Sequence, residues 1–418
     1  MVYFKTLDDF NVKNKTVIVR VDFNSEVNPQ TKQVTNGIRI CAHAQFTLKE
    51  LAEKGAKTVI LSHQGRKGDP DYTDLKQHAE ILRQILKHPV KYVDDLFGEK
   101  AQNEIKQLQD GEFLILENVR GWSEETKRGT PQQQSKTDLV QNLAPLAHLF
   151  INDAFSVAHR DNVSVVGFTA VLPSVAGRIM ERELKQLKAL ENPHHPCVYV
   201  LGGAKADDSL EISKYILNNN VADNLLLGGI ISQLFMAAKG ITLGKGSMDF
   251  LAKKELLPLI PGIQELLTKH PNKIMLPVDV ALNIDGNRTE IPINQLPSTY
   301  PIFDIGAKTV ENYVNILSKA QAIVVSGPLG VYENKDFCYG TKTIFETIAN
   351  SNVLSLAGGG NTIAAIDQFG LTNKIRYIST AGGALVEALM GKKLPGVTAL
   401  ETATNTKPAD FSQQNKHT

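Results

Sequence analysis

The sequence predicts an α/β fold with two doubly wound parallel-sheet domains joined by a hinge helix. Short apolar runs recur along the 418 residues, and most are followed by an amphipathic stretch of helical length. Strands that alternate with helices are typical of parallel sheets covered on both faces, as in Rossmann-like domains. Because the apolar runs divide evenly between the two halves of the chain, we expect one such domain in each half.

The expected strands are short apolar runs, most of them followed by a residue that favours turns. In the first half they are expected at 17–23, 58–61, 90–93, 113–116, 149–151 and 163–168. In the second half they are expected at 197–201, 224–227, 273–280, 322–325, 353–356 and 375–378. The helices with the clearest amphipathic pattern are expected at 40–54, 75–86, 210–218, 310–319 and 342–349.

A stretch rich in helix-forming residues, GRIMERELKQLKAL, separates the two halves and is followed by prolines. We expect a first domain over 1–175, with 398–418 folding back onto it, a hinge helix over 176–192, and a second domain over 193–397. His194 and His195 follow this helix. We interpret them as linker residues, because no further His, Cys or carboxylate occurs at metal-ligand spacing.

Composition and charge exclude several classes of partner. Lys and Arg number 45 against 44 acidic residues, so no overall charge favours a nucleic acid or a membrane surface. Cys41, Cys197 and Cys338 lie far apart and are interpreted as reduced thiols of a cytosolic protein. The N-terminus has acidic residues where a signal peptide is apolar, and no apolar run approaches the roughly 20 residues of a membrane span. We expect a monomeric cytoplasmic protein that binds small molecules.

Polar and basic residues collect where the expected strands of the first half end. Ligands of open α/β sheets bind beyond the carboxyl ends of the strands. The candidates for such a site are Asp22, Phe23, Asn24, Arg39, His63, Gln64, Gly65, Arg66, Arg120 and Arg160. A single arginine is more often a solvated surface residue, but arginines at successive strand ends favour a site for a small, highly anionic molecule.

Glycines mark the strand ends of the second half, at 202–203, 228–229, 327–330, 358–360 and 382–383. Bare backbone N–H groups and helix N-termini at such positions bind phosphate groups. Lys205 follows the first of these pairs. Taken alone, this stretch is as consistent with a tight turn and an exposed lysine as with a phosphate site. The repeated glycines favour a site for a polyphosphate.

Several catalytic motifs are missing from the sequence. It contains neither GxxxxGK[ST] nor GxGxxG, so a P-loop or a dinucleotide-binding fingerprint is not indicated. HExxH and GxSxG are absent too, which disfavours zinc proteases and acyl-enzyme hydrolases. One domain for a compact polyanion and another for a nucleotide-like phosphate chain suit phosphoryl transfer, in which domain closure excludes water.

The chain resembles the phosphoglycerate kinase family, and its archaeal branch in particular, through motifs that span nearly its whole length. These are RVDFN at 20–24, SHxGR at 62–66, LENVR at 116–120, NDAFxxAHR at 152–160, LGGAK at 201–205, LPVD at 276–279, DIG at 304–306, GPLGVYE at 327–333, GGGNT at 358–362 and LPGVTAL at 394–400. The resemblance implies a glycolytic and gluconeogenic reaction, the reversible transfer between 1,3-bisphosphoglycerate plus ADP and 3-phosphoglycerate plus ATP. Mg²⁺ would accompany the nucleotide.

The resemblance also implies roles for individual residues. Arg39 would act at the reacting carboxyl phosphate, and Lys205 would follow the transferred phosphoryl group from the other side. The substrate would be held by Asp22, Phe23, Asn24, His63, Gln64, Gly65, Arg66, Arg120 and Arg160. The nucleotide would be held by Gly203, Lys205, Gly228, Glu333, Gly359, Gly360, Asn361 and Thr362, with Asn361 as the candidate contact for the metal carried by the nucleotide.

Some positions depart from the commonest family pattern. Ser209 stands where many members have a second lysine, and Asn361 where an aspartate often binds Mg²⁺. Ser326 and Ala381 replace an Asn and a Gly of neighbouring motifs. One alternative is therefore a catalytically weak relative that binds a metabolite or nucleotide. Another is a two-domain dehydrogenase, which the missing GxGxxG disfavours.

Overall fold

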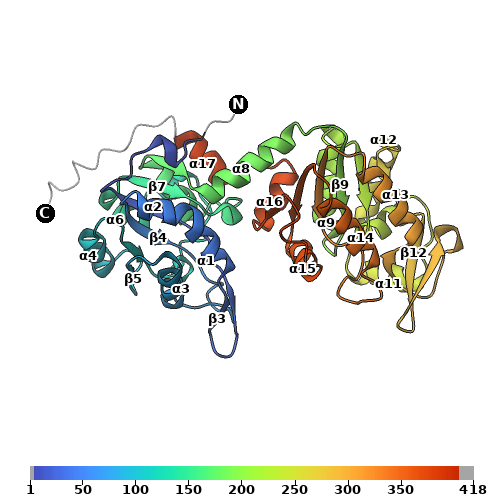
Figure 1. Ribbon diagram of the computed structural model, residues 1–418, viewed down its shortest axis with the longest axis horizontal. Helices are drawn as coiled ribbons and strands as arrows, with labels where there is room; N and C mark the ends of the chain where they lie inside the picture. Colours follow the sequence, from blue (N-terminus) through green and yellow to red (C-terminus); the bar gives the residue numbers. More distant parts are fainter. Residues whose placement is uncertain (1–3, 404–418) are drawn as a thin grey trace. The chain divides into compact units, whose positions relative to one another are not determined.

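The computed structural model describes residues 4–403, and the chain forms two compact units. The first unit holds the residues up to Lys185 and again from Lys393, and the second holds Gln186–Lys392. Each unit is built on a six-stranded parallel sheet with helices packed on it, as predicted (Figure 1).

The sheet of the first unit has the strand order β5-β6-β4-β1-β7-β8. Its strands are β1 (Thr16–Arg20), β4 (Lys57–Leu61), β5 (Val90–Tyr92), β6 (Phe113–Ile115), β7 (Leu149–Asn152) and β8 (Ser174–Ala176). The chain goes from β1 to β4 on one side and later returns to β7 on the other side. The loops after β1 and β7 therefore diverge at a topological switch point, where open α/β sheets bind ligands.

Helices cover both faces of this sheet and form a hydrophobic core on each. Successive residues of β1 belong to one core and then to the other. Val17 and Val19 belong to a core with the helical residue Leu48. Ile18 belongs to the core on the opposite face, with the helical residue Ile105. The helices are α1 (Ile38–His43), the π-helical η2 (Ala44–Leu48), α2 (Lys49–Glu53), α3 (Lys76–Leu86), α4 (Glu99–Gln107), α5 (Pro131–Gln134), α6 (Asp138–Leu143) and α7 (Val163–Val166). Short 3₁₀ turns are η1 (Leu7–Asp9), η3 (Val119–Gly121), η4 (Ala144–Leu146), η5 (Phe155–Val157) and η6 (Gly167–Ala170).

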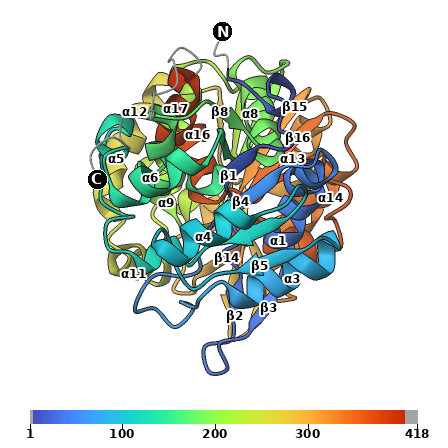
Figure 2. The same ribbon diagram turned by 90° about the vertical axis from the view of Figure 1, so that its left-hand side faces the viewer.

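Two features of the first unit differ from the prediction. The expected strand at 163–168 is wrong, because this run forms α7 and the start of η6, and the sixth strand is β8 instead. All residues of α7 are buried, and a short, mostly apolar run does not distinguish a helix from a strand. The hairpin of β2 (Glu26–Val27) and β3 (Val34–Asn36) was not predicted, and it projects from the unit (Figures 1 and 2).

The sheet of the second unit has the strand order β11-β10-β9-β15-β16-β17. Its strands are β9 (Cys197–Leu201), β10 (Asn224–Leu227), β11 (Ile274–Met275), β15 (Ala322–Ser326), β16 (Leu354–Gly358) and β17 (Tyr377–Ser379). The switch point lies between β9 and β15, so the loops after these strands are the natural ligand site of this unit.

The expected strand at 273–280 is divided in the structure. β11 ends at Met275, and β12 (Asp279–Ile284) belongs to a separate antiparallel sheet with β13 (Asn287–Pro292) and β14 (Ile302–Ile305). Pro277 lies at the break and has no N–H for a strand ladder. The helices are α9 (Ala206–Asn218), α10 (Gly229–Ala238), α11 (Lys245–Lys253), α12 (Ile260–Lys269), α13 (Ala307–Leu317), α14 (Tyr339–Ala349), α15 (Gly360–Gln368) and α16 (Gly383–Leu389), with the 3₁₀ turns η7 (Leu257–Leu259) and η8 (Ile293–Gln295).

Two further helices lie near the points where the chain passes from one unit to the other. α8 (Arg178–Glu191) forms in the stretch expected to connect the halves, and α17 (Pro395–Ala403) returns to the first unit, where the Gly396 N–H donates to the Ala158 carbonyl at 2.8 Å. The rest of the segment expected to fold back, 404–418, lies outside the described residues. Within 4–403, no helix has the length and apolar character needed to cross a bilayer.

Candidate active site

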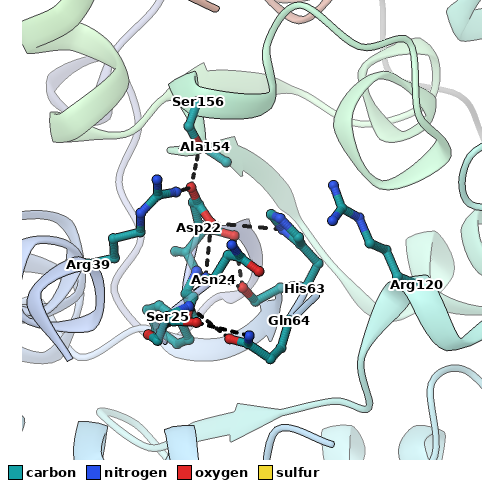
Figure 3. Close-up of polar contacts among 12 residues, drawn as sticks. Asp22, Asn24, Ser25, Arg39, His63, Gln64, Arg120, Ala154 and Ser156 are labelled. Atoms are coloured by element: carbon teal, nitrogen blue, oxygen red, sulfur yellow. Dashed lines mark hydrogen bonds and ion pairs between the residues drawn. The ribbon is translucent and has the colours of Figure 1, made fainter. Parts of the chain in front are cut away.

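The loop after β1 carries Asp22, a buried carboxylate with several polar partners. Arg39 of α1 and the hydroxyl of Ser156 both bind one of its oxygens, Oδ2 (Figure 3). The other oxygen accepts the N–H of Asn24 at 3.0 Å. Burial alone would raise the pKa of Asp22, but the charge of Arg39, with these hydrogen bonds, holds the pKa well below its usual value. Asp22 is therefore an anion at the switch point of the sheet.

His63 follows β4 and lies beside Asp22, with its Nδ1 at 3.9 Å from Asp22 Oδ1. Burial and the neighbouring arginines lower the pKa of His63 well below its usual value, although Asp22 opposes this shift. The buried Arg20 guanidinium donates to Nδ1 at 3.2 Å. Nδ1 is then an acceptor, so the neutral ring carries its proton on Nε2. His63 thus offers an uncharged donor beside the Asp22 carboxylate.

Several arginines of the first unit lie close enough to repel one another. Burial and then the charges of Arg20, Arg160 and Arg66 lower the pKa of Arg120 to about 10. Arg120 remains charged at neutral pH, and its Nη1 donates to the Gly65 carbonyl at 2.7 Å. In Figure 3, Arg39 and Arg120 lie on opposite sides of Asp22 and His63. A cluster of arginines of this kind favours a polyanionic ligand.

Three of the predicted substrate residues contribute to the structure of the loops at this site. The Phe23 side chain is fully buried in the core. The Gln64 side chain is buried and bonds to both backbone groups of Ser25, at 2.8 and 3.0 Å. Gly65 has φ +61°, and a Cβ there would lie 2.6 Å from the Tyr72 backbone nitrogen. These residues shape the loop, and their side chains do not line it.

Three residues near Asp22 were not predicted from the sequence. Arg20 is buried, donates to the Ser164 hydroxyl at 2.8 Å and supports His63. Ser156 binds the Asp22 carboxylate, and the Asp22 N–H donates to His43 Nε2 at 3.1 Å. Ser156 lies inside the motif at 152–160, and His43 lies four residues after Arg39 on the same helix, so both carried a positional signal. Arg20 is the first residue of the motif at 20–24, but its position in a strand did not indicate that its side chain would be buried.

The second unit gathers helix N-termini at the carboxyl edge of its sheet. α9, α10, α15 and α16 all begin within a few residues of the end of a parallel strand. Their first N–H groups have no partner within the helix and carry partial positive charge. A cavity of about 210 Å³ opens at this edge and is lined by Gly203, Ala204, Gly229, Ile230, Ser232, Gln233, Val280, Ile302, Phe303, Asp304, Ile305, Pro328, Leu329, Gly330, Val331, Glu333 and Asn361. This cavity has the chemistry of a site for a phosphate-bearing ligand.

The glycines at this edge are required by close backbone packing. Gly203 has φ +78°, and its N–H donates to the Pro328 carbonyl at 2.6 Å. A Cβ on Gly228 would lie 2.4 Å from Leu329. Gly359 has φ +97° and precedes α15, whereas Gly360 faces open space. Gly203 and Gly359 therefore set the backbone, and Gly360 leaves the start of α15 accessible.

The remaining predicted residues of the second unit differ in exposure. Lys205 is the exposed N-cap residue of α9, and Glu333 and Asn361 are exposed residues that line the cavity. Thr362 is fully buried, and its hydroxyl accepts the Gly327 N–H at 2.7 Å, so it fixes the neighbouring loop. The hydroxyl of the buried Ser209 faces the Gly202 carbonyl at 3.5 Å. Ser209 therefore packs inside the unit.

The side chains near this cavity offer few ligands for Mg²⁺. No cluster of three or more His, Cys, Asp or Glu suited to a metal occurs in the described part of the chain, and Asn361 supplies a neutral oxygen. Mg²⁺ is commonly bound by one or two protein oxygens together with substrate phosphates. The residues therefore fit an ion that arrives with a nucleotide.

A basic cluster at one sheet edge and helix N-termini around a cavity at another define a two-unit α/β phosphotransferase. The family model described as phosphoglycerate kinase matches residues 7–392. A phosphoglycerate kinase of Methanothermobacter thermautotrophicus is 45% identical over 399 residues, which cover 95% of this chain and 97% of that protein. One of Methanobacterium bryantii is 46% identical over 398 residues, covering 95% and 97%.

Solved structures give the same result. The crystal structure of a phosphoglycerate kinase from Pyrococcus horikoshii has a TM-score of 0.87 and 39% identity, covering 96% of this chain and 99% of that one. The structure from Coxiella burnetii has a TM-score of 0.83 and 31% identity with the same coverage. The chain belongs to the phosphoglycerate kinase family, which confirms the resemblance found in the sequence. It is a kinase with a carboxyl group as phosphoryl acceptor.

Proposed function

We propose that the chain transfers a phosphoryl group reversibly between 1,3-bisphosphoglycerate and ADP, giving 3-phosphoglycerate and ATP. The observation that carries this proposal is the gathering of Arg20, Arg66 and Arg160 around Arg120, whose charges add to the effect of burial in lowering the pKa of Arg120. Such a cluster suits a small ligand with a phosphate and a carboxylate. Family membership supports the same reaction.

The first unit is the proposed phosphoglycerate site. Arg66, Arg120 and Arg160 would bind the phosphate that is not transferred, since their charges converge. Asp22 and the neutral His63 would bind the glycerate part. Asn24 would position this loop, because its side chain already accepts the Gly65 N–H at 2.7 Å.

Arg39 is the proposed catalytic residue of the first unit. Its side chain is 36% exposed and is anchored to Asp22, so the guanidinium is held near the glycerate site but remains accessible. In phosphoryl transfer, charge spreads over the equatorial oxygens of the transferred group. A fixed guanidinium there stabilises the transition state more than the ground state.

The second unit is the proposed nucleotide site. The N-termini of α9, α10 and α15 would bind the phosphates, and Glu333 would bind the ribose at the cavity. Lys205 would follow the transferred phosphoryl group as a mobile point charge. Mg²⁺ is proposed to bind with the nucleotide near Asn361 and to neutralise its phosphates.

One coupled assay tests the proposed function. ADP formation from 3-phosphoglycerate and MgATP should be rapid in the wild type and should require both substrates. Lys205→Ala should lower kcat while the protein stays folded. Binding of both ligands by calorimetry without turnover would instead support the alternative, a module that binds metabolites or nucleotides.

We also propose that the two units are separate substrate domains, that α8 is the hinge between them, and that the protein is a cytoplasmic monomer. A hinge at α8 is supported by its length and its position in the chain between the units. If it closes around the ligands, 3-phosphoglycerate and nucleotide together should lower the radius of gyration in small-angle scattering more than either alone.

A further inference from the structure

His43 is a buried histidine directly below the loop of Asp22. It ends α1, and its ring lies edge-on to Phe23 with the ring centroids 6.0 Å apart. Its Nε2 accepts the backbone N–H of Asp22 at 3.1 Å, and its Nδ1 lies 2.6 Å from Asp153 Oδ2. The ring thus bridges the loops that follow β1 and β7.

The hydrogen bonds determine the tautomer of this ring. A backbone N–H only donates, so Nε2 must carry no proton when it accepts from Asp22. Nδ1 then carries the proton and donates it to the carboxylate of Asp153. A neutral His43 ring with the proton on Nδ1 is the form that satisfies both contacts.

Asp153 is in turn held by the start of α8. Its Oδ1 accepts the N–H groups of Ile179 and Met180 at 2.8 and 3.4 Å, and the side chain is fully buried. The chain of contacts therefore runs from the first turn of α8 through Asp153 and His43 to the backbone of Asp22. Gly177 leaves no spare room beside this carboxylate, because a Cβ there would lie 2.2 Å from Asp153 Oδ1.

The helix α1 contacts Asp22 at two places, its carboxylate and its backbone N–H. Arg39 and His43 are four residues apart and share a face of α1. Arg39 binds the Asp22 carboxylate, and His43 binds the Asp22 backbone. A shift of this backbone would therefore move the carboxylate that anchors Arg39.

We propose that His43 and Asp153 form a positioning pair that fixes Asp22 and, through it, the guanidinium of Arg39 for phosphoryl transfer. The inference rests on the proposed role of Arg39 in the reaction. Each donor and acceptor in these hydrogen bonds is assigned. A substitution that exchanges one polar atom for another should therefore disturb the pair without changing the volume of the side chain.

Three variants test this inference. His43→Phe keeps an aromatic ring beside Phe23 but removes both hydrogen bonds. His43→Gln retains an acceptor and a donor on one side chain. Asp153→Asn keeps the shape but must turn an NH₂ group either toward the His43 donor or toward the helix N–H groups, which creates a donor–donor conflict in both cases.

A matched control is Thr169→Val, which removes a buried hydrogen bond of the same unit, from Thr169 Oγ1 to the Val166 carbonyl at 2.6 Å. With 3-phosphoglycerate and MgATP, we expect His43→Phe and Asp153→Asn to lower kcat about tenfold or more, the effect of one critical hydrogen bond. His43→Gln should recover most of this loss, Thr169→Val should not change kcat, and the KM for MgATP should stay the same in all four.

Two further measurements separate positioning from loss of stability. Nitrogen NMR of labelled histidine should show the His43 proton on Nδ1. In an Arg39→Ala background, His43→Phe should no longer lower kcat, because the positioned group is gone. If His43→Phe behaves like Thr169→Val, or if its effect persists without Arg39, the inference is wrong. Absence of turnover in the wild type would contradict the proposed function itself.

Discussion

Acidification is expected to destabilise the first unit through the buried His78 of α3. Its Nε2 donates to Gln64 Oε1 at 3.1 Å, and within the described residues its Nδ1 has no hydrogen-bond partner. Burial lowers the pKa of His78 to about 4, although Asp74 opposes the shift. The folded unit therefore holds this ring in its neutral form.

The sign and size of the effect follow from proton linkage. In the unfolded chain the ring has a pKa of about 6.5, so the unfolded state binds the proton first as the pH falls. Stability is lost below pH 6.5, and the loss levels off once the folded ring is also protonated, below the folded pKa of about 4. With these two pKa values, the site lowers the free energy of unfolding by about 0.2 kcal/mol at pH 7, about 1.4 at pH 5.5 and about 3 at pH 4.

Urea unfolding followed by tryptophan fluorescence measures this loss in the first unit alone. The chain has one tryptophan, Trp122, which lies there with its ring 5.4 Å from that of Phe97. His78→Gln keeps an amide donor toward Gln64 but cannot titrate. Between pH 7 and pH 5.5, the wild type should lose about 1.2 kcal/mol more than this variant.

The control is His148→Gln, since this histidine is exposed in the folded unit. Between pH 7 and pH 5.5, the free energy of unfolding of this variant should fall as much as that of the wild type. Equal losses in the wild type and His78→Gln would show that the folded unit protonates His78 readily, and the reasoning would be refuted.

Three other substitutions are expected to have distinct effects. Arg39→Ala should lower kcat about 10²–10³-fold with a much smaller rise in KM, because a group acting on the transition state is lost; steady-state kinetics in which only KM changes would assign it to ground-state binding. Gly65→Ala should lower the free energy of unfolding of the first unit in urea by at least about 2 kcal/mol, because its Cβ meets backbone atoms. Gly55→Ala, with a similar φ of +68° and its nearest atom 4.0 Å away, should cost less. Equal costs would contradict the clash. Asn361→Asp should tighten MgADP binding up to about tenfold in calorimetry, because a carboxylate is a stronger ligand for a hard cation, and unchanged binding would place the metal elsewhere.

The parallel sheets could be predicted because their strands are apolar runs with little ambiguity. Val17 and Val19, with Ile18 between them, give β1 an apolar run that sequence alone reveals. β8 was missed because it has three residues and follows a longer apolar run that is helical. The error came from the shortness of β8 and the complete burial of α7, and not from the amino-acid composition of either.

The candidate site could be predicted only in part, because partners far apart in sequence give no local signal. Strand ends indicated Asp22, His63 and Arg120. The burial of Arg20 depends on Ser164, 144 residues away, whose hydroxyl in turn donates to the buried Glu125 at 2.6 Å. Such charged pairs inside a fold follow from tertiary packing, which periodicity and spacing do not report.

The return of α17 to the first unit has a consequence for how the chain is made. Ala399 of this helix packs with Ala154 and Val157, which flank Ser156, the residue that binds Asp22. A ribosome therefore synthesises the whole second unit before it supplies the last apolar contact beneath this loop. A chain cut short before Leu394 would leave Ala154 and Val157 without the contact from Ala399.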